Sequence, residues 1–240
     1  MVTLAPERVG ALDSIRELAD SGIIASIGHT AATYEEAALG IKAGSKMVTH
    51  LFNAMNQLHH REPGIFGLIA SPSDRTFRDR GDLPDDGRPY FGLIADGIHL
   101  HPASVRLAWE AHPKGLILIT DAVMLMGCED GVYDWTNGQK IVKKGSLLKL
   151  EGLDTIAGSA TPILDCLNNL MRWTGASIHQ VIQTVTTNPA ALLDLEHTKG
   201  TLAANSDADI VIMRVVPVNK EFTKLEIDEV WKFGHRLFKS

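Results

Sequence analysis

Short apolar runs alternate with helical stretches along this chain, and this alternation limits the folds that are open to it. Runs typical of strands lie at residues 2–7, 23–30, 46–53, 90–101 and 115–123. Between them, residues 11–21, 33–44 and 102–112 have the apolar spacing or end signals of helices. Strands separated by helices predict parallel βαβ units, and near-continuous apolar strands predict a sheet buried on both faces. The pattern therefore predicts an α/β fold of barrel or doubly wound type.

The rest of the chain predicts elements of other kinds. These begin with a long polar loop after residue 53, which includes a solvated insertion over 71–89. They continue with short antiparallel strands over 131–150, a helix over about 160–174 capped by Ser159, two short helices in 177–195, and strands at 207–213 and 224–238. The last two strands predict a small β appendage at the end of the chain.

Composition excludes several classes of protein. A formal charge of −6 leaves no basic surface for nucleic acid, and no apolar run approaches the length of a membrane span. The first ten residues lack the pattern of a signal peptide, and Cys128 and Cys166 cannot build a disulfide framework. We therefore expect a cytoplasmic protein. Ten histidines are many for 240 residues, and they are the one compositional sign of chemistry.

Polar side chains recur where the predicted strands end. His29, His50, His99 and Asp121 each follow an apolar run. Because barrels and doubly wound sheets carry their sites at the carboxyl ends of strands, these four residues are expected at one rim.

The residue types suit metal-assisted hydrolysis. Imidazoles are common zinc ligands, and a catalytic zinc needs about three protein ligands. His29 and His50 could supply two of them, and Asp121 either a further ligand or a general base. His99 could stabilise a developing oxyanion, and Arg61 could bind phosphate or carboxylate.

Each residue also has a plainer interpretation. A single histidine at a strand end is more often structural, and Asp121 could cap a turn. His59 and His60 are surface candidates, although their position beside Arg61 leaves a phosphate contact open. No GxSxG elbow is present, so a Ser-His-Asp hydrolase is not expected. The histidines without such a setting, which we interpret as ordinary, are His101, His112, His179, His197 and His235.

Several motifs, in order, resemble those of the N-acetylglucosamine-6-phosphate deacetylases of the amidohydrolase superfamily. They are GHTAATYEEA, THLFNAM, REPG, IADGIHLHP, ITDA and AGSATPILDCLNNL. Residues 188–213 are similar to a less specific C-terminal signature of many amidohydrolases. The resemblance covers almost the whole chain. It implies a (β/α)8 TIM-type barrel, a small β domain built from both chain ends, and hydrolysis of N-acetylglucosamine 6-phosphate to glucosamine 6-phosphate and acetate.

The resemblance also implies roles for individual residues. His29 and His50 would bind one divalent metal, with zinc the expected ion, and Asp121 would act as general base and then as acid. The substrate contacts it implies are Asn53, Ala54, Arg61 (at the phosphate), His99 and, in the sugar or acetyl pocket, Ile156, Ala157 and Gly158. A homodimer is among the assemblies that it allows.

One departure from the family pattern concerns the metal. The family has a metal-binding glutamate in a HxEGPF-like motif before the strand that matches VTLAPE, and this sequence lacks that motif. Glu7 matches the following strand end, so we do not assign it as the third ligand. The expectation is a barrel represented by about strands four to eight in residues 1–200, incomplete at its N-terminus, with a β appendage in 201–240.

Two other functions are alternatives to deacetylation. A dihydroorotase-like ring opener would usually carry a metal-bridging lysine and paired upstream histidines, so the motifs disfavour it. A catalytically weak or inactive remnant that binds sugar phosphate or a partner chain stays open.

Overall fold

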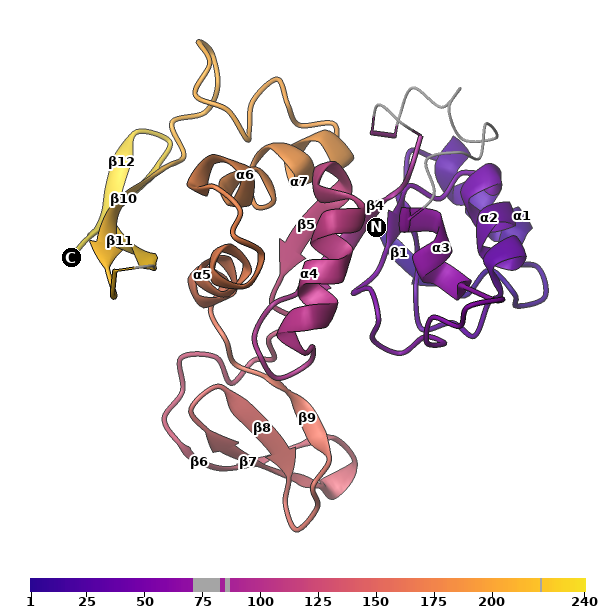
Figure 1. Ribbon diagram of the computed structural model, residues 1–240, viewed down its shortest axis with the longest axis horizontal. Helices are drawn as coiled ribbons and strands as arrows, with labels where there is room; N and C mark the ends of the chain where they lie inside the picture. The colour runs from indigo at the N-terminus through magenta and orange to yellow at the C-terminus, as the bar shows by residue number, and fades with distance from the viewer. Residues whose placement is uncertain (71–82, 85–86, 221) are drawn as a thin grey trace.

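A five-stranded parallel sheet forms the centre of the computed structural model, which describes residues 1–70, 83–84, 87–220 and 222–240 (Figure 1). Its strands are β1 (Val2–Leu4), β2 (Ala25–Ile27), β3 (Met47–Val48), β4 (Tyr90–Ile94) and β5 (Leu116–Ile119). They are hydrogen-bonded in sequence order, each parallel to the next. The predicted α/β class with a parallel sheet is confirmed, and all five strands lie within the predicted runs.

Helices follow the first four strands. They are α1 (Ala11–Asp20), α2 (Tyr34–Ala43), α3 (Gly64–Ala70) and α4 (Pro102–Ala111). Thr33 begins α2 with the predicted capping box to Glu36, and Gly44 ends it with a φ of 129°. The predicted polar loop is wrong at residues 64–70, which form α3. Six of its seven residues are buried, so the apolar periodicity of a surface helix is missing there.

The helices pack mainly on one face of the parallel sheet. Ile27, Val48, Phe91 and Leu118 belong to the largest cluster of buried apolar residues, together with side chains of α2, α3, α4 and α5 (Ile163–Thr174). A smaller cluster joins the strand residues Met47, Tyr90 and Ile117 to Leu192 of α7 (Thr187–Leu192). The sheet is therefore buried on both sides, as near-continuous apolar strands require.

An antiparallel sheet is inserted between β5 and α5. It contains β6 (Gly131–Asp134), β7 (Lys140–Lys144), β8 (Leu147–Leu150) and β9 (Ile156–Ser159), paired in that order. The predicted strands over 131–150 are confirmed. A single turn of 3-10 helix, Thr136–Gly138, lies between β6 and β7, and another, Pro113–Gly115, precedes β5.

The expected N-cap at Ser159 is wrong. Ser159 ends β9, and Pro162 stands at the start of α5 without a side-chain cap. The Ser159 hydroxyl donates to Thr161 Oγ1 at 2.8 Å and accepts from the Thr161 amide at 3.0 Å. It therefore stabilises the bend between strand and helix.

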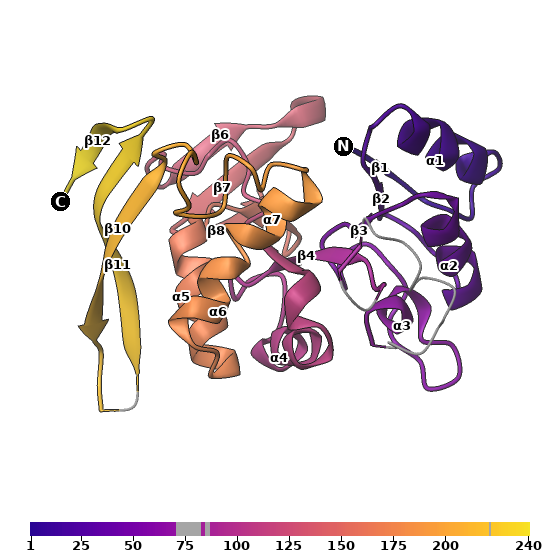
Figure 2. The same cartoon turned by 90° about the horizontal axis from the view of Figure 1, so that it is seen from above.

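The end of the chain forms a separate antiparallel sheet. After α6 (Ile178–Gln183) and α7, its strands are β10 (Ile210–Pro217), β11 (Thr223–Lys232) and β12 (His235–Lys239). Figure 2 shows α5 and α6 between this sheet and the parallel sheet. Asn168 on α5 donates to the Leu225 carbonyl at 3.1 Å and accepts from its amide at 2.7 Å. This pair of bonds attaches β11 to the helix.

Most of the predicted insertion at 71–89 lies outside the described residues. Among the helices of the described residues, none is long and apolar enough to span a bilayer.

Candidate active site

His29 and His50 lie together at the ends of neighbouring strands. Their Nε2 atoms are 2.9 Å apart, and the rings meet edge to face with centroids 4.8 Å apart. His50 is buried, and its Nδ1 has no hydrogen-bond partner within the described part of the chain. The predicted proximity of the two histidines is therefore present.

The backbone at these strand ends is left-handed. His29, His50, Ala54 and Asp121 have φ values of 49°, 23°, 48° and 49°. Residues with a Cβ rarely adopt such angles, and each instance costs about 1–3 kcal/mol. Strain of this kind clusters at functional sites, and here it occurs after β2, β3 and β5.

Glu7 joins the loops that follow β1 and β2. Its carboxylate accepts from the Thr30 hydroxyl at 2.5 Å and from the Ala31 amide at 2.9 Å. Burial raises the pKa of Glu7, but the bonds from Thr30 and Ala31 outweigh it and hold the pKa below its ordinary value. The Thr30 amide in turn donates to the Ala54 carbonyl at 3.0 Å. Three strand ends are thus connected around His29.

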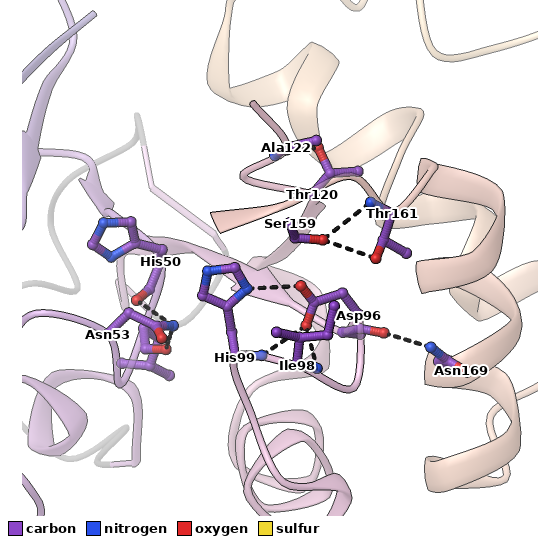
Figure 3. Close-up of polar contacts among 12 residues, drawn as sticks. His50, Asn53, Asp96, Ile98, His99, Thr120, Ala122, Ser159, Thr161 and Asn169 are labelled. Carbon is purple, nitrogen blue, oxygen red and sulfur yellow. Dashed lines mark hydrogen bonds and ion pairs between the residues drawn. The ribbon is translucent and has the colours of Figure 1, made fainter. Parts of the chain in front are cut away.

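His99 is held by Asp96 in the turn after β4 (Figure 3). One carboxylate oxygen of Asp96 accepts from the amides of Ile98 and His99 at 2.8 and 2.9 Å, and the other bonds His99 Nδ1 at 2.7 Å. Asn169 on α5 donates to the carbonyl of Ala95 at 2.9 Å. The turn that carries His99 is therefore fixed at several points.

Asp96 and His99 each change the pKa of the other. Burial raises the pKa of Asp96, but the bonds from His99 and Ile98 outweigh it, so the pKa lies below the ordinary value. The bond to Asp96 raises the pKa of His99 against the opposing effect of burial, and the charges of Asp96 and Asp121 add to the rise. Asp96 is a site residue that was not predicted from the sequence. Its signal was a carboxylate three residues before a histidine in a glycine-containing turn.

Asp121 lies beside strand β9. The next two residues pair with the end of this strand: Ala122 forms a parallel bridge with Ser159, and the Val123 amide donates to the Ser159 carbonyl at 3.0 Å. Within the turn, the Ala122 amide donates to the Thr120 hydroxyl oxygen at 3.2 Å. The predicted pocket residues Ile156, Ala157 and Gly158 belong to β9, so the structure brings them next to the Asp121 loop.

Gly158→Ala is expected to lower the free energy of unfolding by about 1–3 kcal/mol, because this position is strained and crowded. Its φ is 138°, and an added Cβ would lie 2.9 Å from Val123 Cγ1. Urea unfolding measures the change. Gly138→Ala is the control, with a positive φ but open space around it. An equal loss in both variants would mean that contact with Val123 is unimportant.

The remaining predicted residues differ in their surroundings. The Asn53 amide nitrogen donates to the carbonyls of His50 and Leu51, at 3.3 Å each. Arg61 lies in an exposed turn between His59 and Glu62, where its backbone amide donates to His59 Nδ1 at 3.3 Å. The structure thus ties Asn53 to the end of β3, whereas it leaves the side chain of Arg61 exposed to solvent.

The donor set for a metal is a pair. In the described ranges, no group of three or more histidine, cysteine, aspartate or glutamate residues forms a metal-binding cluster. Two nitrogens on one tetrahedral zinc, each about 2.1 Å from it, lie roughly 3.4 Å apart. The 2.9 Å between the two Nε2 atoms is about 0.5 Å shorter than that separation, so the two rings would move slightly apart around an ion. The pair fits two positions of a metal's coordination shell.

Comparisons with known proteins agree on one family. The model of the amidohydrolase family matches residues 3–236. An N-acetylglucosamine-6-phosphate deacetylase of Danio rerio is 38% identical over 97% of this chain and 55% of its own length. The Bos taurus protein of the same name is 42% identical over 89% of this chain and 50% of its own. The chain spans about half the length of these curated relatives.

Solved structures give a similar result. The N-acetylglucosamine-6-phosphate deacetylase of Thermotoga maritima superposes with a TM-score of 0.79 at 29% identity, over 99% of this chain and 59% of the other. A mutant of the Mycobacterium smegmatis deacetylase, in complex with N-acetyl-D-glucosamine-6-phosphate, gives a TM-score of 0.80 at 32% identity. That match covers 98% of this chain and 57% of the other.

Proposed function

Because this chain belongs to the amidohydrolase family, we propose that it carries out metal-dependent hydrolysis of N-acetylglucosamine 6-phosphate to glucosamine 6-phosphate and acetate, a step of amino-sugar catabolism. Its similarity to deacetylases named for this substrate supports the reaction. The observation that carries the proposal is the left-handed backbone at His29, His50 and Asp121. Such strain persists where it orients reacting groups.

The proposed architecture is a (β/α)8 TIM-type barrel to which residues 1–200 contribute about strands four to eight. Residues 201–240 would form the small β appendage. Two features of the molecule support this. The five parallel strands pair in sequence order, and their helices pack mainly on one face, as in a sheet that curves into a barrel.

The proposed metal ligands are His29 and His50, and zinc is the expected ion because imidazole nitrogen suits it. A bound divalent metal would supply a Lewis acid for the amide carbonyl and a more acidic water. The facing Nε2 atoms and the general metal dependence of amidohydrolases support this assignment.

Asp121 is the proposed proton carrier. It takes a proton from the water whose oxygen attacks the carbonyl carbon. It returns that proton to the sugar nitrogen as the C–N bond breaks, so the products are an amine and acetate. An amine is a poor leaving group unless it is protonated, and one carboxylate can serve both steps.

The other proposed residues bind and orient the substrate. His99 would donate a hydrogen bond to the carbonyl oxygen as negative charge develops on it. The remaining proposed contacts are Asn53, Ala54, Arg61, Ile156, Ala157 and Gly158. Gly158, which lacks a side chain, would let the end of β9 approach the sugar closely.

Arg61→Ala is expected to raise KM for N-acetylglucosamine 6-phosphate by about 10–100-fold, because hydrogen bonds to a charged group contribute about 1.5–3 kcal/mol. Turnover of unphosphorylated N-acetylglucosamine should change much less. Steady-state kinetics on both substrates measure the difference, with Arg106→Ala, on the exposed side of α4, as the control. Equal losses on both substrates would contradict a phosphate role for Arg61.

The direct test is acetate release from N-acetylglucosamine 6-phosphate, followed by proton NMR. Dihydroorotate is the competing substrate, and ring opening in place of deacetylation would support the second amidohydrolase function. Binding of the sugar phosphate without turnover would support the non-catalytic alternative. The proposal includes a cytoplasmic location, and gel filtration tests whether the chain forms a homodimer.

A further inference from the structure

The Asp96 carboxylate determines which ring nitrogen of His99 carries a proton. One of its oxygens already accepts two backbone N–H bonds, from Ile98 and His99, and the other lies 2.7 Å from His99 Nδ1. An ionised carboxylate only accepts hydrogen bonds. His99 Nδ1 must therefore carry a hydrogen and donate it to Asp96.

The proton on Nδ1 determines what Nε2 of His99 can do. A neutral imidazole carries one N–H, so a neutral His99 that donates from Nδ1 has a bare Nε2, which can only accept. A carbonyl oxygen also only accepts. Nε2 can stabilise the oxygen of an amide substrate only when His99 carries both protons.

We propose that Asp96 is the positioning residue that keeps His99 doubly protonated during catalysis, so that Nε2–H is the donor to the carbonyl oxygen of the substrate. This inference rests on the proposed deacetylation. In that reaction His99 keeps both its protons while Asp121 carries the proton of water. Activity then requires an ionised Asp121 together with a charged His99.

The groups around the pair favour a charged imidazole. Asp96 and Asp121 both raise the pKa of His99, whereas burial opposes them. On the far side of Asp96 lie Cys166 and a surface cavity of about 420 Å³ that is also lined by Asp165, Arg172 and Lys224. Lys224 pairs with Glu226 at 2.7 Å, and the Arg172 guanidinium lies over the Phe222 ring. On the side of the strand ends lie His50, which follows β3, and its partner His29, which follows β2.

The raised pKa of His99 determines how its charge depends on pH. Because its folded pKa is raised, His99 is charged at low pH and loses its second proton as pH rises through that value. The alkaline limb of the activity profile is therefore assigned to His99.

The test is an NMR titration of the chain labelled with nitrogen-15 in its histidines. In the wild type, both ring nitrogens of His99 should be protonated at the pH of greatest acetate release. In Asp96→Asn, which keeps the shape of the side chain but removes its charge, the titration midpoint of His99 should fall. Asp165→Asn is the matched control, because Asp165 lines the same cavity as Asp96 but makes no hydrogen bond or ion pair with His99 among the described residues. In this variant the titration midpoint of His99 should stay that of the wild type.

Kinetics give the second measurement. Asp96→Asn should lower kcat for deacetylation by about 10–100-fold, the usual scale for a residue that orients an active-site group. It should move the alkaline limb to lower pH and change KM less. A merely structural Asp96 would leave the position of that limb unchanged.

Two results would overturn the inference: a bare Nε2 in the wild type at the pH of greatest activity, or the same midpoint in wild type and Asp96→Asn. The wild-type spectrum decides even if Asp96→Asn does not fold. Without acetate release, the proposed function fails, whereas a midpoint that depends on Asp96 would still support the ionisation described here.

Discussion

Asp121→Asn is expected to lower kcat for acetate release by about 100-fold or more, the usual loss when a general acid–base group is removed. The asparagine amide keeps the shape of the side chain, but it can neither accept the proton of water nor return it to the amine. The measurement is a steady-state assay of acetate release by the variant and by the active wild type. Metal content is determined in parallel.

The metal content of Asp121→Asn should stay near that of the wild type, since Asp121 is assigned to proton transfer. Asp134→Asn, an exposed aspartate on β6, is the control for the same chemical change elsewhere. Wild-type turnover in Asp121→Asn would remove this residue from the mechanism. A parallel loss of metal would make it a ligand.

The 240-residue chain is expected to hold zinc weakly, and His29→Ala should weaken that binding by more than about 100-fold. Even the loss of a group that only supports a ligand typically costs about 10–100-fold in affinity, and His29 is one of the two proposed ligands. Competition with a chromophoric chelator measures the affinity, and elemental analysis after dialysis measures the retained zinc.

His179→Ala, at the exposed start of α6, is the control for the loss of a histidine. We also expect little acetate release after dialysis, when the weakly held zinc has been lost, and release should return when zinc is added. One tightly bound zinc per chain, with ordinary turnover and no effect of His29→Ala, would contradict both the assignment and the expected weakness.

The elements that sequence reasoning predicted best are those with strong local signals. The capping box marks the start of α2 through contacts between Thr33 and Glu36, three residues apart. Pro102 marks the start of α4 by its own backbone preference. Helix α3 has no such signal, since burial on nearly all sides removes its periodicity. Ser159 is a good N-cap residue by type, but pairing of β8 with β9 takes it into a strand. Pairing with the preceding strand overrode the local preference there.

Some features of the candidate site were predictable from the sequence, and others were not. The nearness of His29 and His50 was predictable, because parallel strands bring their carboxyl ends to one edge. The bond from Asp96 to His99 depends on how one turn folds, and the sequence analysis missed it. The roles of Arg61 and of the β9 residues stay predictions.

Adjacent asparagines on α5 have a mechanical consequence for His99. Asn168 clamps Leu225 of β11, and Asn169 holds the carbonyl of Ala95, the residue before Asp96. A single rigid helical turn therefore links the C-terminal sheet to the support of His99. A displacement of that sheet that takes α5 with it would shift the carbonyl of Ala95 and, through Asp96, the imidazole. The sheet would then affect the alignment of the site without supplying a side chain to it.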